Sequence, residues 1–167
     1  MQLPKRKLLR MPDYKYDSPG YYFITICAKN RMHSFWKSDG SFTQQPENDS
    51  APWLFQPDYT AVGMMIDEAI QKVSRIYPNI SVDQYCIMPN HLHLLIKLEE
   101  AQVNHVDSAK LSKAISRMKA FVSKQTGYPV WQRGYYDHVL RNKEDYLAIW
   151  KYIDENPMKW QQDEYYN

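Results

Sequence analysis

The chain has 167 residues, of which 44% are hydrophobic and 14% aromatic, so residues 1–167 suit one globular domain with a sizeable core. A net charge of only +2 excludes nucleic-acid binding driven by bulk charge, so any basic footprint has to come from local clusters. The sequence shows no membrane-spanning stretch and no signal-peptide core, so we expect a cytoplasmic protein without a membrane partner.

The first twelve residues form a basic arm. Its charges come from Lys5, Arg6, Lys7 and Arg10, and Pro12 follows them. Such an arm is usually disordered, but it also suits contact with phosphates. The sequence leaves both readings open.

The next part of the chain predicts a strand, a loop, a helix and two strands. Residues 21–27 are β-branched and aromatic, as in a buried strand, whereas 37–58 are polar and proline-rich, as in a long insertion. Apolar residues then recur at helical spacing over 60–76. Strands follow at 80–87 and 91–98, separated by a Pro-Asn turn.

The C-terminal part predicts a helix at 108–126, a strand at 135–141 and a last helix at 142–156 that Pro157 ends. The order of elements indicates an α+β fold. We expect a ferredoxin-like antiparallel sheet with helices packed on one face, followed by the C-terminal helix.

The strand at 91–98 carries a pair of histidines. Because side chains alternate along a strand, His91 and His93 point to one side with Leu95 and Lys97, while the intervening residues point into a core. Two imidazoles on one side can bind one metal ion. The competing interpretation is a pair of hydrogen-bonded histidines at a sheet edge.

The last helix places Tyr152 and Asn156 on one face, because they are four residues apart. This shared face makes the pair a second candidate for a functional site. The competing interpretation is a surface tyrosine and an asparagine that caps the helix before Pro157.

Basic residues gather on the middle helix, where Lys110, Lys113 and Arg117 lie opposite the apolar stripe. Arg133 follows within the segment 131–136, which mixes aromatic and basic side chains. This pattern suits stacked, unpaired bases and paired phosphates. A solvated helix face and ordinary packing at a strand edge explain it equally well.

Several segments together resemble one family. Met88–Leu95 resembles the HUH motif (histidine, hydrophobic residue, histidine) of single-tyrosine transposases, and 22–27, 131–138 and 152–160 are similar to blocks of REP-associated tyrosine transposases. The resemblance covers nearly the whole chain in order, apart from the insertion around 37–58. It implies a DNA-processing enzyme related to insertion-sequence transposases.

The resemblance also implies a site. His91 and His93 match the histidines that bind a divalent metal, Mg²⁺ or Mn²⁺, and Tyr152 matches the nucleophile. Asn156 stands where many relatives have a glutamine that completes the metal site. His138 is a candidate for support of these groups. The implied substrate is single-stranded, hairpin-forming repeat DNA, cleaved through a covalent 5′-phosphotyrosine.

The resemblance leaves the assembly open, because relatives act as monomers or as homodimers that exchange the tyrosine helix. It also implies that the basic arm contacts the base of the hairpin stem. Two other functions stay open. One is a non-catalytic hairpin-binding protein descended from a transposase, and the other is a metal-dependent phosphodiester hydrolase that uses the histidines without the tyrosine.

Overall fold

The computed structural model describes residues 18–37, 57–100 and 110–166. The basic arm and residues 38–56 of the insertion lie outside these ranges. In chain order, the elements are β1 (Gly20–Cys27), η1 (Lys29–Arg31), α1 (Ala61–Ile76), β2 (Ile80–Ile87), β3 (His91–Leu98), α2 (Leu111–Thr126), β4 (Tyr136–Leu140), α3 (Lys143–Glu155) and η2 (Asn156–Gln162). None of the helices in the described ranges has the length and apolarity needed to span a bilayer.

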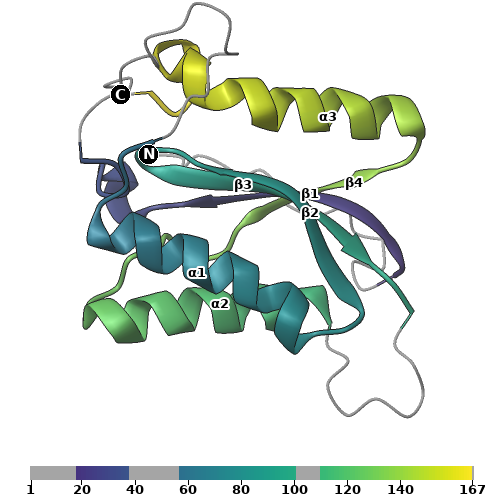
Figure 1. Ribbon diagram of the computed structural model, residues 1–167, viewed down its shortest axis with the longest axis horizontal. Helices are drawn as coiled ribbons and strands as arrows, with labels where there is room; N and C mark the ends of the chain where they lie inside the picture. The colour runs from purple at the N-terminus through teal and green to yellow at the C-terminus, as the bar shows by residue number, and fades with distance from the viewer. Residues whose placement is uncertain (1–17, 38–56, 101–109, 167) are drawn as a thin grey trace, which may run out of the picture.

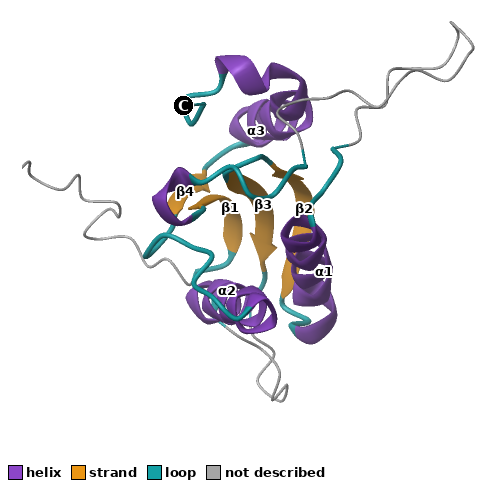
Figure 2. Ribbon diagram, turned by 90° about the vertical axis from the view of Figure 1, so that its left-hand side faces the viewer, coloured by secondary structure: helices purple, strands orange, loops and turns teal. Residues whose placement is uncertain are grey.

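The strands form one antiparallel sheet in the order β2-β3-β1-β4. This order arises when two β-α-β units interleave, and it confirms the predicted ferredoxin-like α+β fold. Helices α1 and α2 cover one face of the sheet, whereas α3 lies across the opposite face (Figures 1 and 2). The C-terminal helix therefore makes a third layer, and β3 is buried on both of its faces.

Strand β1 shows how the sequence divides between the two faces. Tyr22, Ile24 and Ile26 are fully buried in the core that lies between the sheet and the first two helices. The alternate residues Phe23 and Thr25 point the other way, where they contact groups beneath α3. One strand thus supplies the core on one side and the floor of a site on the other.

The C-terminal segment differs from the expected simple helix stop. Asn142 caps α3 as predicted, because its side chain accepts a hydrogen bond of 2.8 Å from the Asp145 backbone N–H. The α-helix ends at Glu155, but Pro157 does not end the helical path. It stands in the first turn of η2, where a missing N–H costs no hydrogen bond. The chain therefore turns back toward the histidine strand.

The two ends of the 37–58 insertion lie close together. Lys37 and Asp58 form an ion pair of 2.8 Å, and the Lys37 backbone N–H donates to the Asp58 carbonyl. Trp36 and Tyr59 pair beside them as an isolated β-bridge. The insertion therefore leaves and rejoins the domain at one point, and α1 follows directly.

Candidate active site

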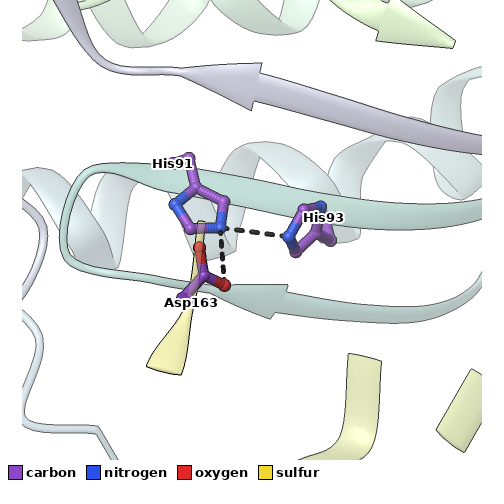
Figure 3. A group of neighbouring side chains, drawn as sticks. All are labelled: His91, His93 and Asp163. Atoms are coloured by element: carbon purple, nitrogen blue, oxygen red, sulfur yellow. Dashed lines mark hydrogen bonds and ion pairs between the residues drawn. The ribbon is translucent and has the colours of Figure 1, made fainter. Parts of the chain in front are cut away.

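The two histidines occupy the central strand β3, between β1 and β2, and not a sheet edge. Both side chains are fully buried, and their Nε2 atoms are 3.0 Å apart on the α3 side of the sheet (Figure 3). Burial lowers the pKa of His93 to about 3. Burial, followed by the neighbouring His93 and Arg31, also lowers the pKa of His91 well below its usual value. Both rings are therefore neutral at neutral pH, as metal ligands must be.

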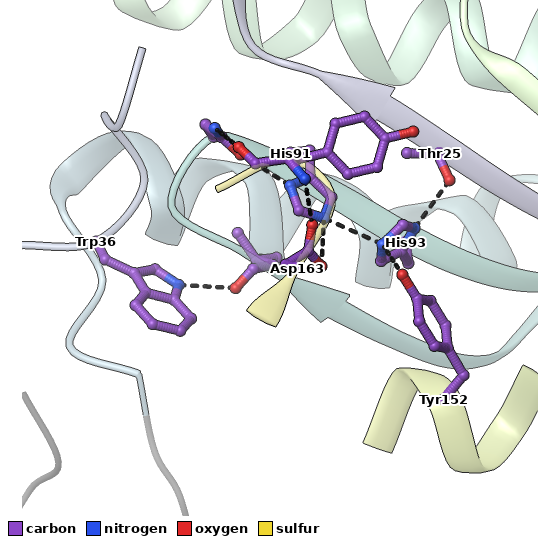
Figure 4. Close-up of polar contacts among 9 residues, drawn as sticks. Thr25, Trp36, His91, His93, Tyr152 and Asp163 are labelled. Carbon is purple, nitrogen blue, oxygen red and sulfur yellow. Dashed lines mark hydrogen bonds and ion pairs between the residues drawn. The ribbon is translucent and has the colours of Figure 1, made fainter. Parts of the chain in front are cut away.

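Each ring is held in place through its other nitrogen (Figure 4). His93 Nδ1 lies 2.8 Å from the Thr25 hydroxyl, and His91 Nδ1 lies 2.8 Å from the Asn90 side-chain oxygen. An amide oxygen only accepts, so His91 Nδ1 donates and its Nε2 carries a lone pair. The threonine hydroxyl can accept or donate, so it suits either tautomer of His93. These contacts orient both Nε2 atoms toward one point.

Loss of the Thr25 hydroxyl should weaken metal binding. The Thr25→Val variant keeps the volume of the side chain but leaves His93 Nδ1 without its partner, so we expect the affinity for Mn²⁺ to fall about 10- to 100-fold. Calorimetric titration with Mn²⁺ measures this change. Thr25→Ser retains the hydroxyl and serves as the matched control. Equal affinities for the valine and serine variants would contradict the role given to Thr25.

Tyr152 projects from α3 toward the histidines (Figure 4). Its hydroxyl oxygen lies 3.3 Å from His93 Nε2, and its ring packs edge-on against Phe23. The side chain remains 40% exposed, so a large substrate can reach it. Burial, and then the charge of Asp163, raise the pKa of Tyr152 to about 12. The phenol therefore needs help to lose its proton at neutral pH.

Asn156 and Asp163 both lie near this tyrosine, on the segment that turns back through η2. Asn156 is buried, and its Nδ2 makes no hydrogen bond of ordinary length within the described part of the chain. Burial raises the pKa of Asp163, as it raises that of Tyr152, and the nearby Asn156 amide offsets part of both shifts. An unpartnered Nδ2 group suits a ligand that accepts a hydrogen bond, whereas a metal ion would need the amide oxygen.

Asp163 is the site residue that the sequence did not reveal. One of its carboxylate oxygens lies 3.8 Å from His91 Nε2, and the donor atoms of Asp163, His91 and His93 all lie within 4.8 Å of one another (Figure 3). The sequence offered no signal for it, because Asp163 comes after the proline at which the helix was expected to end. Only the path of η2 carries it to the histidines.

An open cavity of about 1030 Å³ is lined by His93, Tyr152, Asn156 and Asp163. Strand β1 provides Phe23 and Thr25, and β4 provides Tyr136 and His138. The predicted supporting residue His138 thus belongs to the cavity wall, but among the described residues it makes no hydrogen bond to either histidine of β3. The cavity can accommodate several atoms of a flexible polymer around Tyr152.

Three of the predicted basic residues lie away from this cavity. Lys113 and Arg117 belong to α2 and Lys110 is its N-cap residue, so all three lie on the opposite face of the sheet from α3 and Tyr152 (Figure 1). Arg117 donates a hydrogen bond of 3.2 Å to the Tyr77 hydroxyl. These residues cannot contact a phosphate that lies beside Tyr152.

The remaining basic residues fall into two groups. Arg133 lies in the exposed loop before β4, and the neighbouring Trp131 is buried in ordinary packing, with its indole N–H donating to the Lys119 carbonyl. Lys5, Arg6, Lys7 and Arg10 lie outside the described residues. Of these residues the structure therefore places only Arg133, which does not line the cavity.

The sequence and fold match known proteins. The family model described as "Transposase IS200 like" matches residues 53–156. An uncharacterised protein of Haemophilus influenzae is 30% identical over 181 residues, which cover 96% of this chain and 93% of that protein. A second protein of that organism, named as a REP-associated tyrosine transposase, is 31% identical over 163 residues, which cover 89% of this chain and 77% of the relative.

A solved structure shares the fold. It is that of a REP-associated tyrosine transposase bound to a REP hairpin, and it matches with a TM-score of 0.60 and 24% identity over 92% of this chain and 77% of the other. The family match covers most of the chain and includes the histidine strand, the tyrosine and Asn156. The chain therefore belongs to the IS200-like transposases, a family of DNA-processing enzymes.

Proposed function

We propose that this protein is a metal-dependent endonuclease and strand transferase that acts on single-stranded DNA through a covalent 5′-phosphotyrosine at Tyr152. One observation carries the proposal. The Tyr152 hydroxyl lies 3.3 Å from His93 Nε2 within a single chain, at an open cavity. A nucleophile beside paired metal-ligand candidates is an arrangement that suits metal-assisted transfer of a phosphodiester.

The residues present fit a divalent metal. His91 and His93 would supply two nitrogens, and the Asp163 carboxylate or the Asn156 amide would supply oxygen. The two Nε2 atoms lie 3.0 Å apart, close enough for both to bind one ion. A mixed nitrogen and oxygen set suits Mn²⁺ better than Mg²⁺. When bound, the ion would withdraw charge from the phosphate oxygens.

The transfer of the DNA phosphate to Tyr152 proceeds through side chains of this protein. The Tyr152 hydroxyl oxygen forms a bond to phosphorus and loses its proton to solvent in the open cavity. The bond from phosphorus to the 3′ oxygen breaks, and that oxygen leaves with its electron pair and takes up a proton. A later 3′ hydroxyl reverses these changes and rejoins a strand. His91 and His93 stay fixed throughout, because Asn90 and Thr25 hold their rings.

The proposed substrate is hairpin-forming DNA. The solved relative with this fold was captured with a REP hairpin, and a curated relative carries the same family name. The histidine pair and the tyrosine come from one chain, so we propose that a monomer holds a complete site. Its substrate would place the protein with the chromosome, in the bacterial cytoplasm.

Covalent trapping tests the proposal. The full chain is incubated with Mn²⁺ and a labelled hairpin oligonucleotide with single-stranded flanks, and the products are separated on a denaturing gel. We expect a slow protein–DNA band that a chelator prevents and that peptide mapping assigns to Tyr152. Cut DNA without this band would instead support a hydrolase, and binding without cutting across several hairpins would support a non-catalytic binding protein.

A further inference from the structure

The turn directly after β1 has an unusual backbone. Asn30 has φ 55° and ψ 22°, and Arg31 follows with φ 52°. The left-handed region is tolerable for asparagine but unfavourable for arginine, because the Cβ crowds the carbonyl oxygen. The surrounding chain fixes this turn, since the Ala28 N–H donates to the Asn90 carbonyl and the Lys29 N–H donates to the Val130 carbonyl. Residues held in such conformations cluster at functional sites.

The Arg31 side chain lines the same cavity as His93 and Tyr152. Its guanidinium carbon lies 5.2 Å from the centre of the Tyr165 ring, and that ring in turn packs 4.5 Å from His91, measured between ring centres. The aromatic contact holds the guanidinium beside Tyr165, and no hydrogen bond from its N–H donors is formed within the described ranges. Arg31 therefore presents a directed set of donors beside the histidine pair.

The positive charge of Arg31 is available to bind an anionic substrate. Among the described residues, Arg31 and Lys159 are the two lysine or arginine side chains that line the cavity. Lys159 is neutralised by an ion pair of 2.6 Å with Glu155. No carboxylate of the described residues pairs with Arg31, although Glu164 and Asp163 also line the cavity. An exposed arginine without an acidic partner is suited to an anionic ligand.

We propose that Arg31 is a catalytic residue that binds the phosphate attacked by Tyr152, an inference that rests on the proposed function. Its planar fork would donate two N–H bonds to the non-bridging oxygens of that phosphate. These bonds hold the phosphorus in place while the bond to the Tyr152 oxygen forms and the bond to the 3′ oxygen breaks. They also stabilise the negative charge that these oxygens carry during the transfer.

The first test compares Arg31→Gln with Lys29→Gln. Both residues lie in η1 and are exposed, but Lys29 does not line the cavity. The comparison therefore separates the loss of a phosphate contact in the cavity from the general loss of one positive charge. We expect the rate of adduct formation with Mn²⁺ and the hairpin oligonucleotide to fall about 100-fold or more for Arg31→Gln. Lys29→Gln should retain the wild-type rate. An Arg31→Gln rate within twofold of wild type would overturn the proposal.

A second test needs no cleavage. In the Tyr152→Phe background, the affinity for a single-stranded oligonucleotide is measured as a function of salt concentration. Loss of one phosphate contact should reduce the slope of log affinity against log salt by about 0.7 for Arg31→Gln and leave it unchanged for Lys29→Gln. This measurement still decides the phosphate contact if wild-type protein forms no adduct, a result that would overturn the proposed function instead.

A third variant excludes a folding defect. Glycine adopts positive φ without strain, so Arg31→Gly should keep or raise the melting temperature while it loses adduct formation as Arg31→Gln does. Arg31→Lys keeps the charge without the fork and should lie between wild type and Arg31→Gln. If the melting temperature of Arg31→Gly fell together with its adduct formation, and the salt slopes were equal, the role of Arg31 would be structural.

Discussion

Replacing Tyr152 with phenylalanine is expected to abolish covalent adduct formation, a loss of at least about 10⁴-fold, because the change removes the attacking oxygen and nothing else. The ring keeps its edge contacts with Phe23 and His93. The hydroxyl is 3.3 Å from His93 Nε2 and partly exposed, so its removal leaves no buried group stranded. Hairpin affinity should stay within about twofold of wild type. A denaturing gel and a binding titration on the same preparation measure both quantities.

The matched control for this substitution is Tyr136→Phe. Tyr136 lines the same cavity and is similarly exposed, at 43%, but lies on β4 and not on α3. We expect this variant to form the adduct at a rate close to that of wild type. If Tyr152→Phe formed the adduct and Tyr136→Phe did not, the nucleophile would lie on β4. An adduct in both single variants that vanished in the double variant would mean that either hydroxyl can attack.

Acid should destabilise the metal-free protein through the two histidines. In the unfolded chain they take up protons below about pH 6.5, whereas in the folded chain burial keeps His93 neutral down to about pH 3 and depresses the pKa of His91 in the same direction. The unfolded state therefore binds more protons, and stability falls as pH falls below about 6.5. By pH 5 His93 should cost about 2 kcal/mol, and His91 should add to this loss in the same direction.

Urea unfolding at pH 8 and pH 5, with chelator present, measures this loss. The control is a double variant with glutamine at positions 91 and 93, which removes both titrating groups and should lose less stability over the same range. The carboxyl groups away from the pair are common to both proteins, so the difference between the two losses reports mainly on the histidines. Equal losses for the two proteins would show that the buried pair does not resist protonation. Added Mn²⁺ should raise the stability of the wild type at pH 8 and leave the variant unchanged.

Much of this architecture was predictable because its signals are local. The strands at 80–87 and 91–98 follow from alternation and a Pro-Asn turn, and the structure confirms their bounds. The helical spacing of Tyr152 and Asn156 likewise places both near one face. Local periodicity determines which residues share a face, and the family resemblance indicated that the helix and the histidine strand meet.

The remaining features depend on contacts between distant parts of the chain. The sequence could not show that α3 covers the face opposite α1 and α2. It also could not show that the histidine strand is central, and one interpretation placed the pair at a sheet edge. Asp163 reaches them because η2 continues past Pro157. Arg31 belongs to no periodic pattern in the sequence, and its left-handed backbone is visible only in three dimensions. The rule that a proline ends a helix overlooks Asp163, and a count of charged residues overlooks Arg31.

The position of the tyrosine on an outer layer has a consequence for how the protein opens. His91 and His93 belong to a strand that is hydrogen-bonded on both sides, whereas α3 lies on the outside of the sheet, with Ile153 as its buried residue. Regions with few buried apolar groups open at a lower free energy than the whole domain. Partial release of α3 would carry Tyr152, with any DNA end attached to it, away from the histidines while the sheet stays folded. The packing of α3, and not the global stability of the domain, would then limit how far the attached DNA end can move from the histidines.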